Sequence, residues 1–216
     1  MPLGFERAVF AAASVSFMLS ARPVLADGAV EPPYGRIDGD ISLVVGAGAM
    51  VLPGALRVEG EVRIRYLDTA GVYAAYEDGP LVASDSEPRR AFSTGLELRP
   101  VFLARWLNGL ETERARFDMM LDSIGLDLGA IFLQPRGGGF ASRSGFVVGL
   151  GVEIPIFANA SGPWIDLHGG MRWGEDAVIL GVVRGAVDRS AFLAITLSWH
   201  QFVSTHLVDV RDEAPQ

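Results

Sequence analysis

Strict alternation between apolar and polar side chains runs through this chain in eight stretches. In residues 37–51, for example, Leu43 and Val45 alternate with Ser42 and Gly46. A period of two places successive side chains on opposite sides of an extended backbone, so each stretch is predicted to be a β-strand. One face of these strands carries no charged residue, and the other face carries nearly all of the charge.

The eight predicted strands are each about 10 to 15 residues long, which suits a tilted crossing of a lipid layer. Eight is an even number, and an even set of antiparallel strands can close on itself. The predicted fold is therefore all-β: an eight-stranded antiparallel up-and-down transmembrane β-barrel over residues 37–202. The strands are expected at residues 37–51, 57–66, 92–106, 123–132, 145–156, 164–173, 177–187 and 191–200.

The volume of the side chains decides which face is inside. A soluble barrel of lipocalin type would place the apolar face inside, but three of the four tryptophans and several phenylalanines lie on that face. An eight-stranded lumen has no room for them, whereas the other face is rich in small residues. Its acids and arginines nearly cancel, as buried charges require. The predicted lumen ion-pair network consists of Glu61, Arg63, Arg65, Glu97, Arg99, Asp127, Glu153, Asp166 and Arg172.

Aromatic residues near the strand ends are expected to form interfacial girdles, represented by Tyr66, Trp106, Trp173 and Trp199. If both termini lie in the periplasm, Trp106 falls at an outer strand end. The periplasmic strand ends would then carry Tyr66, Phe92, Phe132, Phe146, Trp173 and Trp199.

Some features between and within the strands fit the pattern less well. Pro100 and Pro155 fall inside predicted strands, where a missing N–H predicts a bulge. The supposed periplasmic connection 67–91 is long, unless the second strand runs on through Tyr73 and Tyr76. The segment 110–121 has apolar residues at helical spacing and predicts a short helical turn.

The N-terminus has the pattern of a secretion signal. Arg7 precedes an apolar run over residues 8–19, and small residues precede a cleavage point after Ala26. Residues 1–26 are therefore predicted to be a signal peptide and residues 27–36 an N-terminal segment. Together with the barrel, this predicts location in the cell outer membrane, with residues 203–216 as a C-terminal tail.

The last predicted strand resembles the C-terminal assembly signal of the small eight-stranded outer-membrane β-barrel superfamily of Gram-negative bacteria. The residues that carry the resemblance are the alternating Ile195, Leu197 and Trp199, followed by Phe202. The resemblance covers roughly residues 37–202 and is one of architecture. It implies outer-membrane lipid as the surroundings, the barrel-assembly machinery as a partner during biogenesis, and a monomer. It identifies no surface partner.

Composition excludes several classes of function. The chain has no cysteine, so it has no disulfide, thiolate metal site or catalytic thiol. Its net charge of −8 argues against nucleic acid as a partner. The spacing of the histidines and acids matches no metal-ligand motif, and no cofactor is expected.

A catalytic grouping is conceivable on two strands. Ser198 and His200 share a face, as do Asp166 and His168, but residues two apart on a strand lie roughly 7 Å apart, too far for a nucleophile–base hydrogen bond. Asp38 and Asp40, on the paired first strand, are the acids that would complete a triad. The prediction is a non-enzymatic envelope protein with a structural or surface-interaction role. The alternatives are a lipid-modifying enzyme, a soluble lipocalin-like barrel and a narrow channel.

Overall fold

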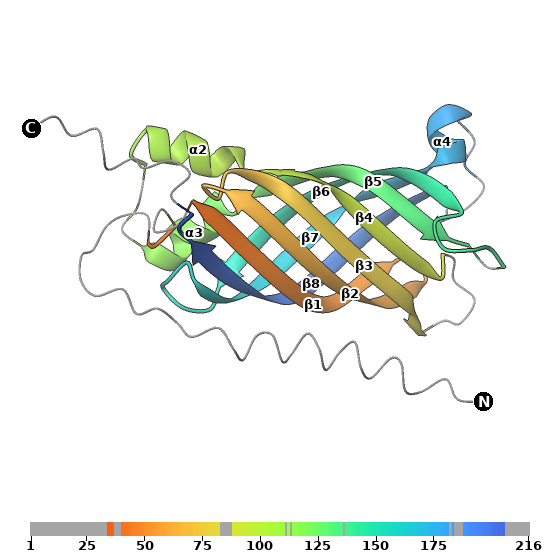
Figure 1. Cartoon of the computed structure of the whole chain (residues 1–216), viewed down its shortest axis with the longest axis horizontal. Helices are drawn as coiled ribbons and strands as arrows, with labels where there is room; N and C mark the ends of the chain where they lie inside the picture. Colours follow the sequence, from red (N-terminus) through yellow and green to blue (C-terminus); the bar gives the residue numbers. More distant parts are fainter. Residues whose placement is uncertain are drawn as a thin grey trace, which may run out of the picture. The chain divides into compact units, whose positions relative to one another are not determined.

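The computed structural model describes residues 34–36, 40–82, 88–110, 112, 114–135, 137–181, 183 and 188–205. Eight antiparallel strands close into a barrel in which each strand pairs with the next and β8 pairs with β1 (Figure 1). This confirms the predicted all-β up-and-down barrel. The strands are β1 (Ile41–Leu52), β2 (Ala55–Tyr66), β3 (Ala70–Val82), β4 (Arg90–Leu98), β5 (Gly125–Gln134), β6 (Arg143–Pro155), β7 (Gly162–Gly174) and β8 (Arg189–Val203).

In the described part of the chain, three short helices lie at the two ends of the barrel (Figure 1). The end at which β1 begins carries α2 (Pro100–Leu107) and α3 (Ala115–Asp122), and we call it the α3 end. The opposite end carries α4 (Glu175–Ile179), and we call it the α4 end. Among the described residues, no helix combines the length and apolar character needed to span a bilayer.

The number of strands is as predicted, but two of their positions are not. The connection predicted at 67–91 contains β3, because Leu67 and Asp68 adopt positive φ angles of 47° and 52° and turn the chain back along β2. The strand predicted at 177–187 is wrong. Its first residues form α4, and part of the remainder lies outside the described residues.

The two prolines have simpler explanations than bulges. The strand predicted to reach residue 106 ends at Leu98, and Pro100 opens α2, where a helix needs no N–H donor. Pro155 is the last residue of β6 and pairs with Trp164 in unbroken register. The register shift that does occur lies in β2, around Arg57, opposite β3. The helical turn predicted at 110–121 corresponds to α3.

Polar and apolar side chains lie on opposite faces of the barrel wall. On β2, Arg63 and Arg65 are buried in the interior, whereas the intervening Ile64 is 44% exposed on the outer wall. The same alternation on β1 buries Ser42 and leaves Leu43 39% exposed. The polar face therefore lies inside the barrel and the apolar face outside, the reverse of a lipocalin-type barrel.

The α3 end contains a small apolar core of its own. Met119 of α3, Ala160 and Trp164 are fully buried there, with Tyr34 and Phe202 packed against them. A second hydrophobic cluster of buried residues, Ala91, Ile131, Leu133 and Val147, lines the wall of β4, β5 and β6 toward the α4 end.

Candidate functional site: the ion-pair network of the lumen

Five charged side chains form a buried cluster toward the α3 end. Arg65 Nε lies 2.8 Å from Glu97 Oε2, and Arg99 Nη1 lies 3.0 Å from Asp68 Oδ2. Arg65 and Arg99 also both pair with Glu153, each with a different carboxylate oxygen. All five are at most 2% exposed. Each charge in this cluster therefore has an opposite partner, which is the condition for burying it at tolerable cost.

Arg63 organises the middle of the lumen. Its Nε lies 2.9 Å from Glu61 Oε2, and its Nη1 lies 3.0 Å from Asp127 Oδ1 and 3.1 Å from Glu97 Oε2. The Tyr73 ring lies beneath the guanidinium, 5.4 Å from Arg63 Cζ. One guanidinium thus links β2, β4 and β5 across the interior.

A further pair lies toward the α4 end. Arg172 Nη1 donates to Glu77 Oε1 at 3.0 Å, and Nη2 lies 3.2 Å from Met50 Sδ. The Phe192 ring packs 5.6 Å from Arg172 Cζ. Arg57 lies on β2, next to the strand of Glu77, but it does not join this pair. It donates to the backbone carbonyl groups of Pro88 and Arg89.

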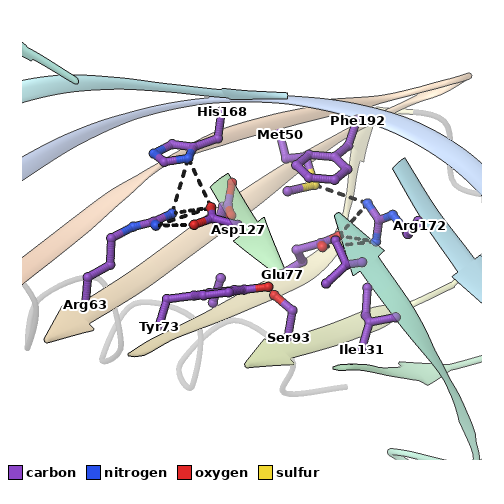
Figure 2. Close-up of a pocket in the computed structure, with 13 residues that line it drawn as sticks. Met50, Arg63, Tyr73, Glu77, Ser93, Asp127, Ile131, His168, Arg172 and Phe192 are labelled. Carbon is purple, nitrogen blue, oxygen red and sulfur yellow. Dashed lines mark hydrogen bonds and ion pairs between the residues drawn. The ribbon is translucent and has the colours of Figure 1, made fainter. Parts of the chain in front are cut away.

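A small cavity separates the middle of the lumen from the Arg172 pair (Figure 2). Arg63, Asp127 and His168 converge on one side of it, and Glu77 and Arg172 meet on the other. Its volume is about 30 Å³, enough for one or two water molecules. A cavity of this size has no room for an organic ligand.

α3 is fixed by a polar cluster outside the strands. The Asp118 carboxylate accepts hydrogen bonds from Tyr34 Oη at 3.0 Å, Arg105 Nη2 at 2.5 Å and the Thr112 hydroxyl at 2.9 Å. Burial alone would raise the pKa of Asp118, but these donors stabilise the carboxylate and hold the pKa below its usual value. Arg36 donates to the Met119 carbonyl at 2.5 Å and lies 3.3 Å from the Asp122 carboxylate. These contacts tie the N-terminal segment and both helices to the mouth of the barrel.

The nine residues predicted for the lumen network all lie in the interior, and the structure brings eight of them into arginine–carboxylate pairs. The exception is Asp166, which has no arginine within 4.0 Å in the described part of the chain. Sequence reasoning missed Glu77, because β3 was not recognised as a strand. It also missed Arg36 and Asp68, which flank the strands and carry no alternation signal.

Of the four predicted girdle residues, Tyr66, Trp173 and Trp199 face outward. Trp106 lies in α2 and not in a strand, and its side chain is outside the described residues. The prediction that one strand end collects all six aromatic residues is wrong, because the strands between residues 70 and 174 run differently from the prediction. Tyr66 and Trp199 lie toward the α3 end, and the α4 end carries Phe92, Phe132, Phe146 and Trp173.

The grouping of Ser198, His200 and Asp166 is fully buried. His200 Nε2 is 4.0 Å from Asp166 Oδ1, and the His200 ring stacks on Trp164 with centroids 4.5 Å apart. Asp40 does not complete a triad, since its carboxylate accepts from the Thr205 backbone N–H and hydroxyl, both at 2.5 Å. Asp38 lies outside the described residues. No described path brings a substrate to this serine.

Comparisons of the chain with protein-family models, with curated proteins and with solved structures give no match. Function is therefore inferred from the arrangement of the residues. The buried ion pairs of the lumen connect strands that are not neighbours in the sheet. Such pairs fill the lumen and fix the barrel wall.

Proposed function

We propose that this chain is an outer-membrane β-barrel protein that crosses the lipid with its eight strands, has no enzymatic activity, and serves a structural or surface-interaction role. One observation carries the proposal: away from the strand ends the outer wall of the barrel is apolar, while the charged side chains in the middle of the strands are directed inward. In water such a wall would be strongly unfavourable, and in lipid it is the expected surface.

The sheet register supports a continuous apolar band. Leu96 is 58% exposed, Leu150 is 63% exposed and Leu197 is 54% exposed, so large side chains on three well-separated strands are open to the surroundings. Backbone pairing aligns one outward residue with the next around most of the wall. On β1 to β7 this row consists of Leu43, Ile64, Val72, Leu96, Leu128, Val148 and Met171.

Outward aromatic residues border this band at the α4 end. The register aligns Tyr76 with Phe92 and Phe92 with Phe132, and the two phenylalanine rings lie 6.4 Å apart. Phe146 and Trp173 form a second pair at the same spacing. Aromatic rings at this level suit the boundary between lipid and water. An exposed ion pair of Arg90 and Asp78 lies at the same end, where a charged pair can meet water or headgroups.

The interior supports a non-conducting, non-catalytic role. The ion pairs of Arg63, Arg99 and Arg172 cross the lumen, and the cavity beside Arg63 holds one or two waters at most. Ser198 and His200 are each 1% exposed, which leaves them no contact with lipid. The exposed loops are then the part of the protein available to a partner. At the α4 end these include Phe140, which is 52% exposed.

The absence of cysteine allows a direct test with single-cysteine variants. Leu150→Cys places a label on the outer wall, and Ser142→Cys places one in an exposed loop at the α4 end. In lipid vesicles, an environment-sensitive fluorophore at position 150 should be quenched by brominated lipid chains and not by aqueous iodide, with the opposite result at position 142. Iodide quenching at both positions would overturn the proposal.

Cell fractionation provides an independent test. The protein should co-sediment with the outer membrane and resist extraction by carbonate, whereas a soluble lipocalin-like barrel would be released with the periplasm. With both ends of the barrel sequence in the periplasm, the α3 end faces the periplasm and the α4 end faces the outside of the cell. A membrane-impermeant maleimide applied to intact cells should then label Ser142→Cys but not Asn159→Cys, since Asn159 lies in the loop at the α3 end. The reverse labelling would show that the proposed orientation is wrong.

A further inference from the structure

We propose that the lumen contains a binding site for one divalent transition-metal ion, formed by Asp166 and His168 of β7 and Glu61 of β2. One ligand atom from each of the three residues lies within 4.8 Å of the other two, and all three residues are buried. An imidazole nitrogen with two carboxylate oxygens is a donor set suited to Zn²⁺ and its neighbours in the first transition row. The inference does not depend on where the barrel is located.

Asp166 is the first observation that points to a cation. Its side chain is fully buried, and neither carboxylate oxygen has a hydrogen-bond partner among the described residues. The Ser198 hydroxyl faces this carboxylate but makes no hydrogen bond of normal geometry with it. A buried carboxylate without a donor or a counter-charge is costly, and a bound cation would supply both contact and charge.

His168 is the second and independent observation. Its Nδ1 lies 3.4 Å from Asp127 Oδ2 and 3.3 Å from Arg63 Nη2, and Arg63 also pairs with Asp127. Its Nε2 is buried and has no hydrogen-bond partner in the described part of the chain. In the tautomer that donates from Nδ1 to Asp127, Nε2 carries the free lone pair of a metal ligand and Asp127 is its supporting carboxylate.

Gly151 on the adjacent strand β6 leaves the space that the imidazole occupies. The His168 ring packs directly over this glycine, in space that the Cβ of any other residue would occupy. A side chain at position 151 would therefore displace the ring from its place beside Asp127.

The charge balance of the interior also favours a cation. Among the described residues, seven buried acids lie on the strands, against four buried arginines. Asp166 is the one predicted network residue without an arginine partner. A divalent ion would neutralise charge where no side chain does. The seven acids are Glu59, Glu61, Glu77, Glu97, Asp127, Glu153 and Asp166, and the four arginines are Arg57, Arg63, Arg65 and Arg172.

Asp166 also approaches a second group, formed with Glu153 and His200. Both Glu153 oxygens are already paired with the arginines Arg65 and Arg99, so neither is left for a cation. Glu61 is better placed to bind, because only its Oε2 pairs with an arginine, Arg63, and its Oε1 accepts only from the Thr196 hydroxyl, at 2.5 Å. A hydroxyl can turn to another acceptor and leave that oxygen to the metal.

Metal binding to the purified barrel tests the site. Protein refolded in detergent with Zn²⁺, then freed of excess metal by gel filtration, should retain about one Zn²⁺ per chain by elemental analysis. Asp166→Asn and His168→Gln should each lose the stoichiometric ion. His200→Gln is the matched control, since it removes another buried imidazole beside Asp166 and should retain the Zn²⁺.

The proposal would be overturned if the wild-type protein retained no Zn²⁺, or if Asp166→Asn or His168→Gln retained the ion. It would also be overturned if His200→Gln lost the ion. X-ray absorption at the zinc edge of the wild-type protein keeps the test decisive if a variant fails to fold. The expected spectrum contains one imidazole and otherwise oxygen ligands, and a spectrum without imidazole scattering would contradict the assignment.

Discussion

Arg172 Nη1 lies 3.0 Å from Glu77 Oε1, although the two residues are 95 positions apart and their strands, β7 and β3, are not neighbours in the sheet. The pair therefore spans the lumen. A second contact, from Nη2 to Oε2 at 3.3 Å, fixes the relative orientation of the two groups. Links of this kind hold opposite walls of the barrel together, which pairing between adjacent strands does not do.

This geometry predicts strong coupling between the two side chains. Arg172→Met alone leaves a buried carboxylate unpaired, and Glu77→Leu alone leaves a buried guanidinium, so each should lower the free energy of unfolding by about 3–5 kcal/mol. The double variant removes both charges and should cost less than either single change. Urea titration of the four proteins in lipid vesicles measures the cycle, and additive losses would contradict the pairing.

Arg99 should be among the most sensitive positions. Arg99→Leu removes the partner of Asp68 and Glu153 in one step, and a loss of about 3–5 kcal/mol in the free energy of unfolding is expected. Arg90→Leu is the matched control. It breaks the exposed ion pair with Asp78, whose loss should cost at most about 1 kcal/mol. Equal losses in the two variants would mean that Arg99 is not buried as described.

Asp118 should make the stability of the barrel depend on acid pH. Burial opposes ionisation, but donors on Thr112, Arg105 and Tyr34 outweigh it, so the pKa of Asp118 is lower in the folded chain than the value of about 3.9 expected in the unfolded chain. The stabilisation is therefore complete above about pH 4 and is lost as the pH falls through the folded pKa. The difference in unfolding free energy between wild type and Asp118→Asn should be constant near pH 7 and decrease below pH 4. A difference independent of pH would contradict the role of the carboxylate.

The barrel and its inner face were predictable from sequence because both depend on a local signal, the alternation of side chains. Where alternation is clear, as around Arg63 and Ile64, the prediction of which side chain is buried agrees with the structure. β3 was missed because small and aromatic residues fall on both of its faces, with Tyr73 inside and Tyr76 outside. The two opposing errors, at β3 and at 177–187, left the number of strands unchanged.

The partners of each charge were not predictable, because pairing across the lumen depends on register and on the order of strands around the barrel. Once β3 is placed, Glu77 becomes the partner of Arg172, and nothing in the local sequence indicates this. The isolation of Asp166 is likewise a three-dimensional property. Its neighbours along β7 gave no sign that all nearby arginines are held by other acids.

A filled lumen predicts the absence of conductance. Wild-type protein reconstituted in planar bilayers should give no single-channel steps, because Arg172 and Glu77 close the interior toward the α4 end. Replacing both with alanine removes this pair next to the existing cavity. It should increase the frequency of small leak currents relative to wild type. Regular conductance steps from the wild-type protein would instead support the channel alternative.

The burial of Ser198 allows a test of the alternative that the protein is a lipid-modifying enzyme. Ser198 is 1% exposed, and the nearby His200 ring lies against Trp164, so neither a lipid ester nor an attacking water has access to the hydroxyl. Ser198→Ala and His200→Ala should therefore leave the lipid composition of the outer membrane unchanged in a strain that produces them at wild-type level. Mass spectrometry of extracted lipids, compared with a strain lacking the protein, provides the measurement. If either variant or the deletion strain lost an acyl-chain modification, the protein would be a lipid-modifying enzyme and the lumen would have to open during turnover.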